Sequence, residues 1–460
     1  MHYNEFSKTG EKPYAEIYQQ QLNLFNFAEK EANLYHSNPA SRGYFSILQA
    51  RSNGTVKQRS FPVSELSKVL STLDLLDGDI WISQAEFWSS CRRLVNLKSL
   101  SSSFLDIDGY KSEIGWAFGK SPKAMADAFM FFCDSLEIPR PTVIVFSGRG
   151  IQPKWVFEKP IPRKALPRWN ALQKELINNF LDYGADPVAR DASRVLRVVN
   201  TVNRKSGERC RIVGMTLGED NAPKRYNFEF LCETILPVAR ESCCKKSSSQ
   251  NKNDERKISR EFDVQSLNWA RLEDLRTLLK IRGGIKEGRR ALFLMYMMNF
   301  LALSHQVNNL SFYDEALQLA KEIDPLWTSR SSDLKTVFSK FKEYQQGKII
   351  EFHGKKYPPL YTPKTKTLID LFEISPEEQK QMITLINQSE KNRRLRLSRV
   401  ATGQVMQNRT EYESAAKNKR ERAISLRKNG MSIREIARVM NVSKSSIQKY
   451  LKNLNTSLLN

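Results

Sequence analysis

The stretch Phe104-Leu-Asp-Ile-Asp-Gly-Tyr110 places two aspartates, Asp106 and Asp108, two residues apart among apolar neighbours. Side chains at positions i and i+2 of a β-strand leave the same face of a sheet. Two adjacent carboxylates repel each other unless a cation lies between them, and Mg²⁺ and Mn²⁺ prefer such oxygen ligands. The stretch predicts a core strand, 100–108, that ends at a metal site, although so short a motif alone more often caps a turn.

The composition is that of a folded chain with an unusual charge. Of 460 residues, 40% are hydrophobic and 27% charged, which is ordinary for a globular protein of about three domains. The net charge of +23 favours a polyanionic partner, nucleic acid first. The first residues lack an apolar signal region, and the longest apolar run, 291–303, is too short to span a bilayer. A cytoplasmic protein without a membrane partner is expected.

Cysteine and histidine chemistry is not indicated. The six cysteines lack metal-ligand spacing, and the four histidines lie far from the motifs described here. Zinc sites, disulfide frameworks and Ser-His-Asp triads are therefore not expected, and carboxylates and cationic side chains remain the candidates.

A second motif, Ser147-Gly-Arg-Gly150, follows the apolar run 142–146, which is typical of a buried strand. The glycines allow a ligand to approach the backbone closely, and Ser147 and Arg149 offer a hydroxyl and a guanidinium group for phosphate. Residues 154–157 return as another strand. The motif therefore connects two strands, and an ordinary hairpin is equally compatible with it.

The densest group of charged residues is the block 186–205. It holds Asp186 and Asp191 beside a row of hydrogen-bond donors, namely Ser193, Arg194, Arg197, Thr201, Asn203 and Lys205. Carboxylates for a metal next to cations for a triphosphate are what phosphoryl transfer requires. A solvated salt-bridge ladder is the alternative, but it does not explain the apolar pairs 195–196 and 198–199 between the charges.

Together these motifs resemble the catalytic core of archaeo-eukaryotic-type primases, above all the replication primases of plasmids and other mobile elements. Those enzymes carry a D-x-D strand, a Ser-Gly connection and a block of the form D-P-x-x-x-D-x-x-R-x-x-R…T-x-N-x-K, in this order. The resemblance covers residues 75–215, and the third motif is its most specific part. Two residues depart from the pattern: Gln152 stands near the place of a histidine, and Asn200 where a glycine usually precedes the threonine.

The resemblance implies a role for each motif residue. Asp106, Asp108 and Asp191 would be catalytic and, with Asp186, would bind two Mg²⁺ or Mn²⁺ ions. The incoming nucleoside triphosphate would be bound by Ser147, Arg149, Arg194, Arg197, Asn203 and Lys205. The ions would activate a 3′-hydroxyl and stabilise the leaving pyrophosphate. The sequence leaves open whether Asp186 or Asp191 is the third ligand, and whether ribonucleotides or deoxynucleotides are preferred.

The predicted fold is an α/β primase-type core with an RRM-like sheet, followed by an all-α bundle and a carboxy-terminal helix-turn-helix. The core is placed at 1–240, a polar linker at 241–262 and the helical domain at 263–355. Residues 375–460 are expected to form a basic helical arm and the helix-turn-helix.

The basic tail carries the helix-turn-helix pattern. Residues 391–460 hold 17 Lys and Arg against 4 Asp and Glu, so over half of the net charge lies there. A helix 420–428 stops at Asn429-Gly430, Ser432 and Glu435 form a capping box for a second helix, and Ser443 caps a third, 444–454. The pattern resembles that of resolvases and transposases. The recognition helix would present Lys444, Ser445, Ser446, Gln448 and Lys449 to the major groove, over an inside of Ile436, Ala437, Val442 and Ile447.

The sequence therefore predicts a DNA primase or primase-polymerase of a mobile element. It would bind double-stranded origin DNA through its tail and make short primers from nucleoside triphosphates on a single-stranded DNA template; a helicase partner stays open. Two alternatives remain. One is a non-enzymatic initiator or repressor with a primase-like scaffold. The other is a transposase or integrase, which would explain the Ser-Gly-Arg-Gly motif and the Arg/Lys row poorly.

Overall fold

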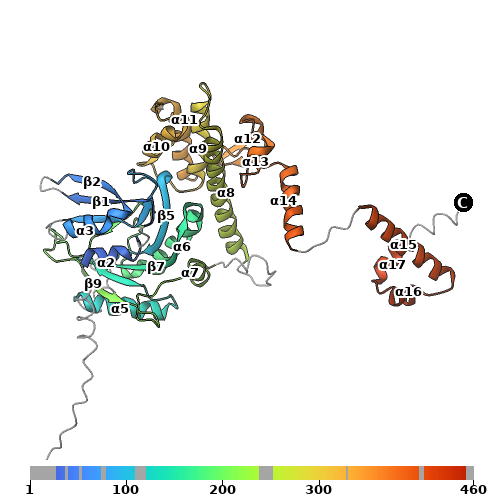
Figure 1. Ribbon diagram of the computed structural model, residues 1–460, viewed down its shortest axis with the longest axis horizontal. Coiled ribbons are helices and arrows are strands. Elements are labelled where there is room, and N and C mark those ends of the chain that lie inside the picture. Colours follow the sequence, from blue (N-terminus) through green and yellow to red (C-terminus); the bar gives the residue numbers. More distant parts are fainter. Residues whose placement is uncertain are drawn as a thin grey trace, which may run out of the picture. The chain divides into compact units, whose positions relative to one another are not determined.

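The computed structural model describes residues 27–36, 40–50, 54–73, 79–108, 121–237, 252–327, 330–402 and 409–451. The chain forms two compact units that divide between Leu385 and Ile386. In the first unit a sheet with its helices is followed by a helical part, and the second unit is helical (Figure 1). None of the described helices is long and apolar enough to cross a membrane.

The first unit is built on an antiparallel sheet. The order across it is β8-β3-β1-β4-β5-β7-β6-β9, and β2 pairs with β1 outside this path. Its strands are β1 (Tyr44–Ala50), β2 (Val56–Pro62), β3 (Ile80–Ser83), β4 (Ala85–Phe87), β5 (Leu97–Phe104), β6 (Val143–Phe146), β7 (Ile151–Pro162), β8 (Val195–Arg197) and β9 (Arg211–Met215). Because β8 and β9 lie at opposite ends of this order, the chain between them crosses the sheet.

Helices cover both faces of the sheet (Figure 1). Helices α2 (Phe27–Asn33) and α3 (Leu66–Leu73) share a buried apolar cluster with Val156 and neighbouring strands. Trp155 points to the opposite face because adjacent strand residues alternate. There its ring packs 6.2 Å from that of Phe129 on α5 (Pro122–Ser135), and Trp169 on α6 (Leu166–Asn179) donates to a strand carbonyl. Helix α7 (Phe228–Ile235) completes the α/β part, and the predicted α/β class is confirmed.

The strand that leads to the aspartate pair ends earlier than predicted. Strand β5 stops at Phe104, and the prediction of a strand through Asp108 is wrong. The Leu105 N–H donates to the carbonyl oxygen of Pro153 at 3.0 Å, but a proline has no N–H to donate in return. The regular ladder therefore breaks opposite Pro153, and Asp106 and Asp108 follow the strand.

Other boundaries also differ from the prediction. A helix is also expected from the sequence over residues 14–33, of which 14–26 lie outside the described residues. The same is true of Gly109 and Tyr110, and of residues 241–251 of the predicted linker. Residues 252–262 of the predicted linker belong to helix α8 (Lys252–Arg282), since lysine, arginine and glutamate extend a helix well. The sequence patterns do not predict β2, β4, β9 or α7.

The helical part packs through an apolar stripe on α8, which the spacing of its leucines in the sequence indicates. Trp269, Leu272, Leu275, Leu278 and Leu279 are at most 5% exposed. The remaining elements are α9 (Arg290–Leu303), α10 (Phe312–Ile323), α11 (Ser331–Gln345), a hairpin of β10 (Ile350–Phe352) and β11 (Lys355–Tyr357), α12 (Thr365–Leu371) and α13 (Pro376–Gln379). Residues 375–385, predicted to belong to the basic arm, lie in this unit, where Asp274 accepts from the backbone of Ile383 and Leu385.

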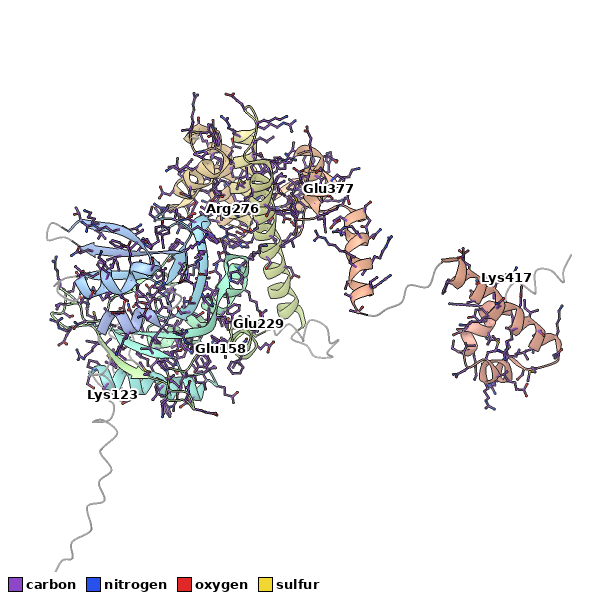
Figure 2. The ribbon with its side chains drawn as sticks, in the orientation of Figure 1. Lys123, Glu158, Glu229, Arg276, Glu377 and Lys417 are labelled. Atoms are coloured by element: carbon purple, nitrogen blue, oxygen red, sulfur yellow. The ribbon has the colours of Figure 1, made fainter. Side chains whose placement is uncertain are left out.

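A buried carboxylate joins the helical part to the sheet part. Glu315 on α10 accepts the N–H groups of Leu94 and Val95, both at 2.9 Å. Beside it, Arg276 of α8 (Figure 2) donates to the Val95 carbonyl at 2.6 Å and pairs with Glu322 at 2.6 Å. These charged groups are shielded from solvent, so removing one of them leaves its partner without a hydrogen bond.

We expect Glu315→Gln to lower the free energy of unfolding of the first unit by about 1–3 kcal/mol, because the amide sets a donor against a buried N–H. Burial raises the pKa of Glu315, so the native state binds its proton more tightly than the unfolded state. The contribution of Glu315 to the free energy of unfolding of the wild type is therefore lost as the pH rises through the raised pKa.

The difference in the free energy of unfolding between the wild type and Glu315→Gln should shrink as the pH rises from about 4 to 7. Urea unfolding followed by tryptophan fluorescence measures it, since all 7 tryptophans precede residue 386. Exposed Glu287→Gln is the matched control and should change little. If this difference in the free energy of unfolding grew with pH, Glu315 would not be a buried group with a raised pKa.

Candidate active site

Two segments far apart in the sequence bring the predicted carboxylates together. Ile107 forms an antiparallel bridge with Ala185, and the Asp186 N–H donates to the Asp106 carbonyl at 2.8 Å. In this register Asp106 stands opposite Asp186, so both side chains leave the same face. Asp108 follows two residues after Asp106 along the same edge.

Arg194 lies among these carboxylates. Its guanidinium nitrogens are 3.2 Å from Asp186, 3.9 Å from Asp191 and 4.0 Å from Asp106. Arg92, which the sequence does not single out, donates to the backbone of the same loop. The cluster therefore holds several negative charges together by means of cationic side chains.

Asp106 differs from an ordinary surface aspartate. Its pKa is raised, chiefly because the group is buried. The charges of Asp108 and Asp186 also raise it, whereas the hydrogen bond from Gln152 and the charge of Arg194 act in the opposite direction. A carboxyl group crowded by like charges is a setting in which a cation binds well.

Two polar residues of β7 support Asp106. The Gln152 amide donates to Asp106 Oδ1 at 3.2 Å, and its own buried Oε1 has no partner among the described residues. Lys154 lies two residues further on the same strand face, fully buried, and pairs with Glu31 of α2 at 2.6 Å. The sequence signal for both is a glutamine and a lysine among the apolar residues of the buried stretch 151–157.

The Ser147–Gly150 turn lies directly against the aspartate segment. A Cβ atom at Gly150 would stand 2.0 Å from the carbonyl oxygen of Ile107, so a side chain does not fit. Ser147 is buried and its hydroxyl donates to the Gly150 carbonyl at 3.1 Å. Asn203 donates to the Ser147 carbonyl at 2.9 Å, while Arg149 is exposed. The structure thus joins the second motif to the first and to Asn203 of the third.

The remaining predicted nucleotide ligands have other partners. Arg197 pairs with Asp79 at 2.6 Å and lies 5.1 Å from the ring centre of Trp81. Lys205 is exposed and donates its backbone N–H to Asn203 at 3.1 Å. The sequence does not single out Asp79, because nothing local connects it with Arg197.

The carboxylate cluster is suitable for a hard divalent cation, but it is not a finished site. In the described part of the chain, no three His, Cys, Asp or Glu side chains are arranged to hold a metal ion. The donors nevertheless fit Mg²⁺ or Mn²⁺, since they are carboxylate oxygens with excess negative charge and partial access to solvent. Arg194 supplies the positive charge among them in this structure.

The second unit contains a small helical core. Its helices are α14 (Gln388–Ala401), α15 (Arg409–Lys428), α16 (Ile433–Val439) and α17 (Lys444–Leu451). Ile436, Ala437 and Ile447 are buried and Val442 packs against them, as predicted. The capping box of Ser432 and Glu435 is also present. Helix α15 begins earlier than the predicted residue 420, and 452–454 of the third helix lie outside the described residues.

The predicted recognition helix is α17. Lys444, Ser445, Gln448 and Lys449 are exposed on it, and Ser446 is half-buried. A surface hollow beside its start is lined by further basic side chains, including Arg434 and Arg438. Polar and cationic side chains on the first turns of a helix are what insertion into a DNA groove requires.

Residues 413–454 match the family model described as "Helix-turn-helix domain of resolvase". The chain ends in a resolvase-type helix-turn-helix. A "Replication protein" of Clostridium perfringens is 28% identical over an alignment of 353 residues that covers 75% of this chain and 79% of that protein. The predicted carboxy-terminal helix-turn-helix is confirmed, as is the predicted order of an α/β part, an all-α part and the helix-turn-helix.

Two solved structures are also similar at low identity. The AEP domain of the cyanophage S-2L primase-polymerase is 19% identical, with a TM-score of 0.33, and covers 47% of this chain and 97% of its own. Primase RepB′ is 11% identical, with a TM-score of 0.26, and covers 68% of this chain and 94% of its own.

We expect Gly150→Ala to destabilise the first unit by about 1–3 kcal/mol, because the new methyl group overlaps the Ile107 carbonyl. Gly54→Ala is the control: a Cβ there meets open space, so only the left-handed backbone (φ +80) opposes it. Urea unfolding of both variants makes the comparison. If both variants lost the same free energy of unfolding, the turn at Gly150 would not be in close contact with the Ile107 carbonyl.

Proposed function

We propose that the protein is a DNA primase or primase-polymerase that acts in the replication of a plasmid or other mobile element. The observation that carries the proposal is the gathering of Asp106, Asp186 and Asp191 around Arg194, beside the Ser147–Gly150 turn. Carboxylates next to a backbone turn and several cations are the parts that nucleotidyl transfer uses. The name of the Clostridium relative supports a role in replication.

In this proposal Asp106 and Asp108, completed by Asp186 or Asp191, hold Mg²⁺ or Mn²⁺. When bound, the ions would activate a primer 3′-hydroxyl and neutralise charge on the leaving pyrophosphate. Asp106 would bind the ion through its carboxylate oxygens, and the Gln152 amide would keep its Oδ1 in place.

The cationic residues would bind the nucleotide. Arg194 would exchange its carboxylate partners for the triphosphate, which offers it bidentate oxygen pairs. Arg149 and Lys205 are exposed at the same turn region, and Ser147 and Asn203 fix its backbone. Asp79 would hold the guanidinium group of Arg197 ready for the nucleotide.

The helix-turn-helix would bind double-stranded origin DNA and so place the core near its single-stranded template. A covalent link of this kind raises the local concentration of template without a new contact at the active site. Nucleoside triphosphates and single-stranded DNA are the proposed substrates.

We expect Asp106→Asn/Asp108→Asn to reduce primer synthesis by at least about a thousandfold, because the chain then lacks the charges that hold the metal. The assay uses circular single-stranded DNA, labelled nucleoside triphosphates and Mg²⁺ or Mn²⁺. Duplex binding should persist, since it depends on the other unit. Primer synthesis by the double variant would refute the site.

We expect Lys444→Gln/Lys449→Gln to weaken duplex binding and to reduce the slope of log affinity against log salt by about 1.8, if each lysine contacts a phosphate. Primer synthesis on single-stranded circles should be unaffected. Electrophoretic mobility shifts at several salt concentrations measure the slope. An unchanged slope would mean that α17 does not face DNA.

A non-enzymatic initiator is the second candidate, and the ion pairs of Arg194 favour it if the guanidinium never leaves the carboxylates. It predicts no labelled product in any metal, beside tight and salt-sensitive duplex binding.

A further inference from the structure

The hairpin of β10 and β11 presents apolar side chains to solvent. All strand residues of both arms are exposed. The register pairs Ile350 with Tyr357 and Phe352 with Lys355. Because directly paired residues and residues two apart share a face, these four side chains form one continuous surface.

This surface is unusual for a free hairpin. Phe352 is 63% exposed, Ile350 42% and Tyr357 39%. A two-stranded hairpin is only marginally stable in water, and contiguous exposed apolar groups rimmed by polar ones mark binding sites. The aromatic rings are therefore available to a ligand.

The positive charge around the hairpin indicates an anionic ligand. Residues 335–366 hold 8 lysines and 2 glutamates, a net charge of +6. Lys355 stands opposite Phe352 on the apolar face, and Lys356 stands opposite Glu351 on the other. Aromatic rings beside lysines suit single-stranded nucleic acid, whose bases stack while its phosphates meet the cations. A duplex, with its bases already stacked, offers no such faces.

We propose that this hairpin is a binding site for single-stranded DNA, with bases stacked on Phe352 and Tyr357 and a phosphate at Lys355 on the same face. Its use as a template contact rests on the proposed function, but the binding itself requires no catalysis.

The test uses the full chain and fluorescence anisotropy with labelled oligo(dT) and a duplex. Phe352→Ala/Tyr357→Ala should weaken oligo(dT) binding about tenfold or more and leave duplex binding unchanged. Leu310→Ala/Leu326→Ala is the matched control, because these side chains are 93% and 95% exposed in the same unit. Equal binding of oligo(dT) by wild type and the aromatic variant would overturn the proposal.

Further variants keep the test independent of folding. Lys355→Gln should lower the salt slope for oligo(dT) by about 0.7, which corresponds to one phosphate contact on a single strand. Lys356→Gln, on the other face of the hairpin, should change the slope less. Phe352→Trp should gain fluorescence that oligo(dT) quenches if bases stack there. Unquenched emission, or a change of oligomeric state in the aromatic variant seen by light scattering, would assign the surface to another partner and overturn the proposal.

The outcomes also separate this site from the active site. Asp106→Asn/Asp108→Asn should bind oligo(dT) as tightly as the wild type. If the wild type makes no primers but the hairpin variants lose oligo(dT) binding, the primase proposal fails and the hairpin site stands. If the wild type makes primers but the hairpin variants bind oligo(dT) unchanged, the primase proposal stands and the hairpin site fails.

Discussion

Repulsion among carboxylates is the constraint on which the candidate site depends. Backbone pairing between the segment after β5 and Asp186 fixes Asp106 opposite a second carboxylate. The two carboxylates repel each other in this arrangement, so a positive charge between them is stabilising. Arg194 provides it in this structure. Because of the same repulsion, the carboxylates would bind a divalent ion when a triphosphate competes for the guanidinium group of Arg194.

The sheet places these charges by means of buried contacts on both sides. Pro153 interrupts the regular ladder beside Leu105, and pairing resumes at Ile107, which bridges both Ile151 of β7 and Ala185. Behind it, Lys154 and Glu31 form an ion pair that is almost fully enclosed, within reach of the charge of Asp106. Such a pair costs free energy to bury, and it holds its surroundings in one arrangement. The polar residues of β7 thus serve the site more than the stability of the core.

The sequence predicts local patterns well and distant partners poorly. Asp106, Ser147 and Arg194 stand in patterns whose residue types already indicate phosphate and metal chemistry, and the structure joins these patterns. The capping box at Ser432 is equally predictable, because its two residues lie only three positions apart. By contrast, Arg197 meets Asp79 across 118 positions, and no periodicity relates residues so far apart. The end of β5 was missed because a proline in the partner strand decides it.

The most direct measurement is a crystal structure of the full chain with Mn²⁺ and a non-hydrolysable nucleoside triphosphate, with data collected at the manganese absorption edge. The account predicts anomalous difference density between Asp106 and Asp108, and a guanidinium group of Arg194 that has moved from Asp186 to the phosphates. A bound nucleotide without manganese at the aspartates, or Arg194 still paired with Asp186 in saturating metal, would contradict it.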